Sequence, residues 1–270
     1  MDKFKSILKA LLFGTIMLLF LICPALISKA LKLSSNRALI FQGGMALLSI
    51  IVPLFYIGHK NYSSSDIGFN KPTKAIMKRL LFYLPLFLPL CALIIAFNKN
   101  TGIKSLVVIA FYALSVSIAL EVYFRGVIQK EFRGKFNVLL GLIIIALIYA
   151  GCNAYYFNRV TSYKHIMMLC AFSFCVAGIT GIVIESKGNI ILTVLFNTLY
   201  LLLTINYTGR GKMLLLSQGI CMAILFVYGL YLLVLYFKDH KVEKVAEPEE
   251  EQIDEASNEE FDENGNITLE

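Results

Sequence analysis

Long apolar segments recur along almost the whole chain, and they constrain its fold more than any other feature. Eight of them approach the roughly 20 helical residues needed to cross a bilayer core of about 30 Å. They cover approximately residues 7–27, 38–57, 80–97, 106–125, 138–156, 166–184, 190–205 and 213–237. Because only 16% of the residues are charged, we predict an all-α, polytopic integral membrane helix bundle of about eight transmembrane helices. A soluble enzyme is excluded.

The charged residues form two opposite blocks. Residues 1–244 hold all 25 basic residues, whereas eleven acidic and no basic residues lie between Glu247 and Glu270. With eight spans, sixteen basic residues fall on the side of the two termini and nine on the other. Cytoplasmic loops of membrane proteins are enriched in Lys and Arg, so both termini are expected to be cytoplasmic, in a multi-pass protein of the cell membrane. Basic clusters that flank apolar segments do not indicate nucleic-acid binding.

This charge pattern divides the chain into a membrane domain, residues 1–244, and an acidic tail, residues 245–270. The tail is poor in apolar residues and should be a disordered cytoplasmic segment, which serves for solubility or docks on a basic partner surface. The six cysteines lie in or beside apolar segments without a CxxC motif. They predict buried apolar side chains, not disulfides or a zinc site.

Glu121 is an ionisable residue inside a predicted span, where insertion costs about 2.5–3.5 kcal/mol. Arg125 follows four positions later, on the same helical face, and can form an ion pair with it. Asn153 and Asn197 add amide groups to later spans, where amides commonly bond between helices. We predict a polar cluster of these four residues. Its role stays open between fastening the helices, contacting a partner or ligand, and general-base or metal-associated chemistry at Glu121.

Common catalytic motifs offer no alternative. The histidines, His59, His165 and His240, lie in predicted loops, at a span edge or near the tail. The sequence contains no HExxH, GxSxG or GxxxxGK[ST] motif, so metalloprotease, serine-hydrolase and P-loop functions have no support. No cofactor and no metal are expected.

The segment Glu121-Val-Tyr-Phe-Arg-Gly-Val-Ile-Gln129 resembles the first motif of the CPBP family, also called the Abi or CAAX prenyl endopeptidase family. In that motif two glutamates are followed, after three residues, by an arginine. Residues 67–72 resemble the family segment that precedes the third span. Residues 149–153 and 188–201 fall where the second and third motifs, FxxxH and HxxxN, would be. The resemblance covers roughly residues 65–205 and implies a CPBP-type helix bundle.

Four motif positions depart from the family. Leu120 stands in place of the first glutamate, Asn153 and Asn197 in place of the two histidines, and Leu201 in place of the third-motif asparagine. In active members the first glutamate and the second-motif histidine activate a water molecule. Leucine and amide side chains cannot take up a proton near neutral pH.

The degenerate site is therefore expected to lack catalytic residues. Its motif positions are Leu120, Glu121, Arg125, Asn153, Asn197 and Leu201. Of the family's charged residues only Glu121 and Arg125 persist, and their pairing should favour the weakly basic, charged form of the glutamate. The chain resembles a pseudoprotease.

What the resemblance implies is a bacterial membrane adaptor that binds another membrane protein and adjusts its activity. A sensor histidine kinase controlling gene expression is the first expected partner and a cell-wall hydrolase the next. Two alternatives remain: an intramembrane CAAX-type endopeptidase that uses Glu121, and a bacteriocin self-immunity protein. A transporter or channel is disfavoured, because no repeated half or row of intramembrane charges is present.

Overall fold

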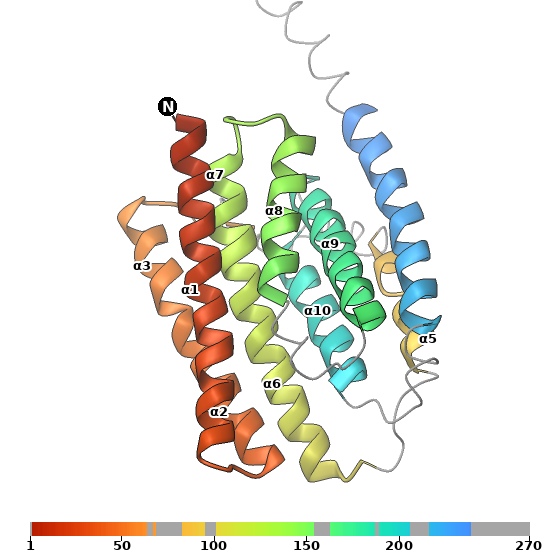
Figure 1. Cartoon of the computed structure of the whole chain (residues 1–270). Coiled ribbons are helices and arrows are strands. Elements are labelled where there is room, and N and C mark those ends of the chain that lie inside the picture. The colour runs from red at the N-terminus through yellow and green to blue at the C-terminus, as the bar shows by residue number, and fades with distance from the viewer. Residues whose placement is uncertain are drawn as a thin grey trace, which may run out of the picture. The chain divides into compact units, whose positions relative to one another are not determined.

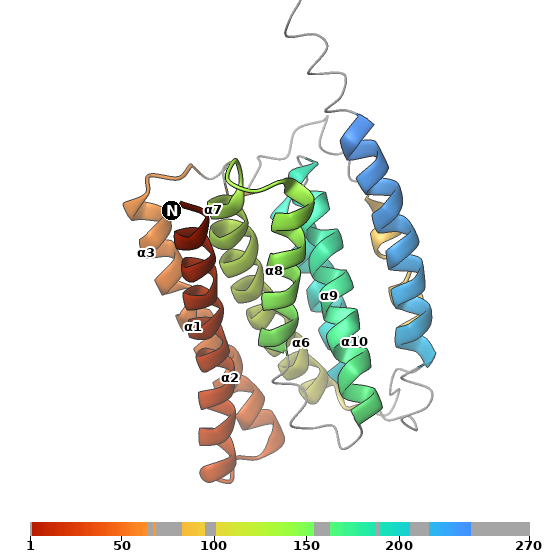
Figure 2. The same cartoon turned by 45° about the horizontal axis from the view of Figure 1, so that its top comes forward.

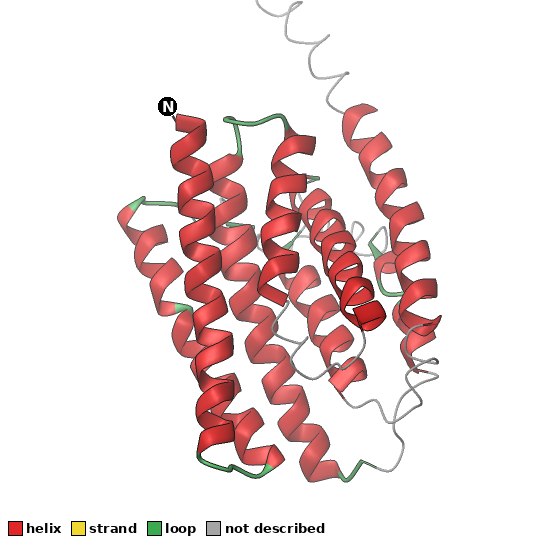
Figure 3. Cartoon of the chain, viewed as in Figure 1, coloured by secondary structure: helices red, strands yellow, loops and turns green. Residues whose placement is uncertain are grey.

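The computed structural model describes residues 2–63, 67–68, 83–94, 101–153, 163–186, 189–205 and 216–238. All regular structure in these ranges is helical (Figure 3). In chain order the elements are α1 (Asp2–Ala30), α2 (Ser35–Ser49), α3 (Ile51–His59), η1 (Leu84–Leu86), α5 (Leu90–Ile94), α6 (Ile103–Glu121), η2 (Val122–Gln129), α7 (Lys130–Phe132), α8 (Val138–Asn153), α9 (Tyr163–Glu185), α10 (Ile190–Ile205) and the helix Leu216–Lys238.

Five helical stretches of the described residues are long and apolar enough to cross a membrane. They are Asp2–Ala30, Ser35–His59, Ile103–Phe132, Ile166–Glu185 and Leu216–Lys238, and two shorter apolar helices, Val138–Cys152 and Ile190–Ile205, accompany them. The predicted all-α, multi-pass membrane bundle is thereby confirmed. The chain divides into two units, Met1–Gly229 and Leu230–Glu270, of which the second is described only to Lys238. The predicted acidic tail, residues 245–270, lies outside the described residues.

The first unit is organised around one long helix, formed by α6, η2 and α7 without interruption (Figures 1 and 2). Helices α1, α2 and α3 lie on one side of it and α8, α9 and α10 on the other. Small residues allow the close approaches that stabilise helix pairs in membranes. At Gly43 of α2, an added Cβ would lie 2.9 Å from the ring of Phe111 on α6, so only glycine permits this contact.

The predicted span 38–57 is bent between α2 and α3. Pro53 has no N–H group, so it cannot donate to the carbonyl of Ser49 one turn earlier. The Tyr123 hydroxyl of η2 donates to that carbonyl instead, at 2.8 Å. In a membrane every backbone polar group needs a protein partner. This bond therefore stabilises the bend and ties it to the central helix.

Two predicted spans differ from the structure. In the described part of the span predicted at 80–97, a short 3-10 helix, η1, is followed by the five-residue α5, so this part is not one continuous helix. Pro85 and Pro89 remove backbone donors there. The span predicted at 106–125 was too short, because the helix continues to Phe132. Arg125 does not end it, since its charge is compensated inside the protein.

The segment after α3 is fastened to the beginning of α10. Gly68, with φ of +86°, accepts a hydrogen bond from the Ile190 backbone N–H at 3.0 Å. The Tyr83 hydroxyl donates to the carbonyl of Ser186 at 3.1 Å. These contacts fix the start of α10. They thereby fix the position along α6 at which the polar residues of α10 make contact.

Candidate functional site

Glu121, the last residue of α6, is completely buried and ties α6 to α10. Its Oε1 accepts a hydrogen bond from the Asn197 amide at 2.6 Å, and its Oε2 accepts one from the Thr193 hydroxyl at 2.6 Å. The Nε of Arg125 lies 3.5 Å from Oε2. Thr193 and Asn197 are four residues apart and share one face of α10. Both carboxylate oxygens are therefore engaged.

Arg125 connects this ion pair to α9 through hydrogen bonds of its guanidinium group. It is 1% exposed, and its Nη2 donates to the Ala177 carbonyl at 2.6 Å and to the Thr180 hydroxyl at 2.5 Å. Its Nη1 donates to Oε1 of Gln129 at 3.1 Å. The planar guanidinium, with donors on several sides, suits such a buried bridge. It joins the central helix to α9.

Gly181 makes room for the guanidinium. A Cβ at this position would lie 2.5 Å from the Leu142 side chain and 3.1 Å from Nη1 of Arg125. Atoms this close would overlap, so the absence of a side chain is what lets α8, α9 and Arg125 meet.

The helix that carries Arg125 widens locally to a π-helix, Val122–Gln129, whose residues are all buried. One further turn along, Gln129 donates to the Gly181 carbonyl at 3.0 Å and to Oε1 of Glu185 at 2.7 Å. Glu185 in turn pairs with Arg133, at 3.3 Å. A row of polar side chains thus runs from the centre of the bundle to its edge.

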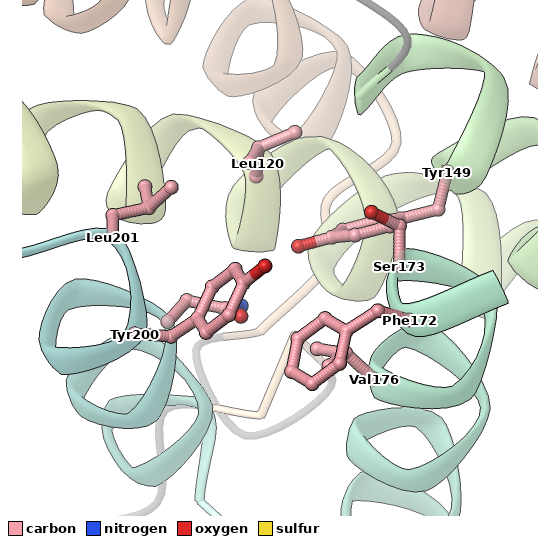
Figure 4. Close-up of a pocket in the computed structure, with 8 residues that line it drawn as sticks. Leu120, Tyr149, Phe172, Ser173, Val176, Tyr200 and Leu201 are labelled. Atoms are coloured by element: carbon pink, nitrogen blue, oxygen red, sulfur yellow. The ribbon is translucent and has the colours of Figure 1, made fainter. Parts of the chain in front are cut away.

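A small pocket lies beside Glu121. Its described lining residues are Leu120, Tyr149, Phe172, Ser173, Val176, Asn197, Tyr200 and Leu201. The hydroxyl groups of Tyr149, Ser173 and Tyr200 point into it, and Leu120 approaches from α6 (Figure 4). The cavity volume of about 20 Å³ is room for about one water molecule. These described lining residues supply hydroxyls, an amide and apolar groups, but no carboxylate or imidazole.

Residues 102–203 match the family model described as type II CAAX prenyl endopeptidase Rce1-like. This segment contains Glu121, Arg125, their partners on α9 and α10, and every residue named for the pocket. Over this segment the chain is similar to the CPBP family. The family resemblance expected from the sequence is therefore confirmed. A comparison with curated proteins gave no match.

The family motif positions whose side chains the structure describes come together around this pocket. Leu120, Asn197 and Leu201 line the pocket, and Glu121 and Arg125 lie next to it. Asn153 is the last residue of α8, but its side chain lies outside the described part of the chain, so its place in the cluster stays a prediction.

Several side-chain roles in this site were missed by sequence reasoning. They are those of Thr193, Thr180, Gln129, Tyr149 and Tyr200, of which Gln129 and Tyr149 were matched only as positions in the family motif segments. Helical spacing holds a signal for two of them, because Thr193 precedes Asn197 by four residues and Gln129 follows Arg125 by four. The position of Thr180 depends on how α9 packs, and no local pattern encodes that.

Proposed function

We propose that the chain is a non-catalytic CPBP protein that acts as a membrane adaptor, binding another membrane protein and modulating it. The observation that carries this proposal is the state of Glu121, the one glutamate retained from the family motif. Both of its oxygens accept hydrogen bonds from α10, and one also faces Arg125. A carboxylate held in this way serves as a fastening between helices.

The chemistry of the neighbouring residues supports the same proposal. A general base needs a free acceptor atom within hydrogen-bond reach of the proton that it removes. The family's first glutamate would stand at Leu120, and a leucine offers no acceptor. The other described groups around the pocket are phenols, a hydroxyl and an amide, which are poor bases near neutral pH.

The partner is proposed from the family resemblance, with a sensor histidine kinase first and a cell-wall hydrolase next. We also propose that both termini are cytoplasmic in the cell membrane of a bacterium, because the basic loops favour that orientation. Large apolar side chains point outwards on α1 and α3, including Leu12, Leu19 and Phe55. They suit contact with lipid and lateral packing against helices of a partner.

The test is cross-linking in native membranes, followed by affinity purification and mass spectrometry. It compares the wild type with Glu121→Gln and with Glu185→Gln, which makes the same chemical change at the edge of the polar row. We expect one membrane partner at the same stoichiometry relative to folded protein in all three. Its identity then decides between a kinase, a cell-wall hydrolase and a bacteriocin target. Intact polypeptides that accumulate only on Glu121→Gln would instead mean that this residue performs proteolysis.

A further inference from the structure

A second buried carboxylate, Glu131 of α7, lies at the end of the bundle where α1 begins (Figure 1). It is 4% exposed. Its Oε1 accepts hydrogen bonds from the hydroxyls of Tyr56, at 2.5 Å, and Tyr62, at 3.1 Å. Its Oε2 accepts bonds from the ammonium groups of Lys9 and Lys135, each at 3.1 Å. Side chains from α1, from α3 and from the segments that follow α3 and α7 converge on one residue.

The two lysines are held close together with their ends partly open to the surroundings. Because both nitrogens lie 3.1 Å from the same oxygen, they are no more than twice that distance apart. Each lysine side chain is 37% exposed. Lys9 also donates to Tyr56, and Lys135 to Ser6. Within the described residues each ammonium thus has two acceptors, which leaves one of its three N–H groups for a further acceptor.

Among the described residues of this cluster the charges do not balance. Two ammonium groups face one carboxylate, which leaves one excess positive charge in that set. A further lysine stands against an aromatic ring nearby: Lys3 lies 5.9 Å from the ring centre of Phe136. Partly buried charge is costly without a counter-charge. The cluster therefore favours an anion.

The position of the cluster near the ends of two membrane spans indicates which anion is available to it. Lys9 is in the first turns of the span Asp2–Ala30, and Glu131 is in the last turn of the span Ile103–Phe132. Tyr56 and Tyr62 stand beside them, as aromatic side chains do where a helix leaves the hydrocarbon core. The phosphate groups of lipids lie at this level, and Lys residues there are attracted by about 1 kcal/mol each to an anionic membrane surface.

We propose that Lys9 and Lys135 bind a phosphate group, that of an anionic phospholipid or a free phosphate ion. Phosphate oxygens accept charge-assisted hydrogen bonds and can bridge two ammonium groups. Glu131 positions both lysines from the protein side, and the two tyrosines hold Glu131 in turn. The site is separate from the pocket at Glu121, so it does not depend on the proposed adaptor function.

The experiment measures binding by the purified full-length chain in a neutral detergent, using native mass spectrometry. The probes are phosphatidylglycerol, phosphatidylcholine and inorganic phosphate. We expect the wild type to bind phosphatidylglycerol more tightly than phosphatidylcholine, and Lys9→Gln and Lys135→Gln each to lower that affinity about fivefold. Lys104→Gln, an exposed lysine in the first turn of α6, is the control and should have no effect. Strong binding of inorganic phosphate that the same variants weaken would identify a free ion as the ligand.

Glu131→Gln separates a phosphate site from a cluster that only fastens helices. Removing the carboxylate leaves two uncompensated ammonium groups, so phosphatidylglycerol should bind more tightly while the ligand-free protein melts at a lower temperature. If this variant does not fold, the single lysine variants carry the test, because their carboxylate keeps both tyrosines and one ammonium. Equal affinity for the two lipids together with no phosphate binding would overturn the proposal. An equal loss of affinity in Lys104→Gln would also overturn it.

Discussion

Two carboxylates on the same long helix, Glu121 and Glu131, are both buried but have different surroundings. Glu121 meets one guanidinium and two neutral donors, and neither it nor Arg125 is open to the surroundings. Glu131 meets two ammonium groups and two phenols, and its lysines are partly exposed. Both acids are buried, so burial does not distinguish the two clusters. The Glu121 cluster has one cation and is closed to the surroundings, whereas the Glu131 cluster has two partly exposed cations and can bind an anion.

The largest loss of stability is expected when the Glu121–Arg125 ion pair is broken. Arg125→Met leaves the Glu121 carboxylate buried without its counter-charge, which costs about 3–5 kcal/mol of folding free energy. Thermal unfolding in detergent and the amount of folded protein in membranes measure the loss. Arg133→Met is the matched control, because Arg133 pairs with Glu185 at the partly exposed edge and should cost below about 1 kcal/mol. Equal losses in the two variants would contradict the distinction.

A smaller loss is expected when one neutral donor is removed from Glu121. Asn197→Leu deletes the amide that bonds to Oε1 and should cost about 1.5–3 kcal/mol, the range for a hydrogen bond to a charged group. The control, Thr198→Val, removes a hydroxyl that bonds only to the Val194 carbonyl of its own helix among the described contacts. The melting temperature of Asn197→Leu should therefore be clearly lower. If the two variants had the same melting temperature, the hydrogen bond to Oε1 would contribute nothing to stability.

Crowding the guanidinium tests its close packing. Gly181→Ala places a methyl group against Leu142 and Arg125 and should cost about 1–3 kcal/mol. Gly178→Ala, one turn earlier on α9, has no heavy atom within 4 Å of the added carbon among the described residues and should be neutral or slightly stabilising. The comparison uses unfolding in the same detergent. A stable Gly181→Ala protein would show that α9 can move away from the ion pair.

The smallest loss of stability is expected at the Glu131 cluster, because Glu131 keeps three hydrogen-bond donors when one is removed. Tyr62→Phe removes one of four donors to Glu131 and should cost roughly 0.5–1.5 kcal/mol. Burial, followed by the charge of Glu131, raises the pKa of Tyr62 from 10.0 to about 12. The unfolded state loses this proton first, so the contribution of the hydroxyl is complete below pH 10 and is lost as the pH rises towards 12. The stability difference between wild type and Tyr62→Phe should shrink over that window. A constant difference would mean that the hydroxyl does not face the carboxylate.

Local sequence patterns were sufficient to predict much of the helix bundle. Apolar length predicted the helix 190–205 at both ends, and four-residue spacing placed Arg125 beside Glu121. The order of the family motifs brought Asn197 to the same place. Pro85 and Pro89 interrupt the apolar segment 80–97, so the prediction of one continuous helix was wrong for the described part of that segment.

The cluster at Glu131 could not be predicted from local patterns. Its partners on α1 and α3 are far away in the chain, and Lys9 is 122 residues from Glu131. The predicted span also ended at Arg125, which left Glu131 in an expected loop. Only the packing of α1 against η2 and α7 brings these side chains together.

Removing both charges of the pair shows whether Glu121 only fastens helices or performs chemistry. Partner recovery per folded molecule is measured by cross-linking in native membranes for the wild type, Arg125→Met and the double variant Glu121→Gln/Arg125→Met. We expect the double variant to regain folded protein relative to Arg125→Met and to bind the partner at the wild-type stoichiometry. A double variant that folds as well as the wild type, yet holds intact polypeptides that the wild type cleaves, would contradict this expectation.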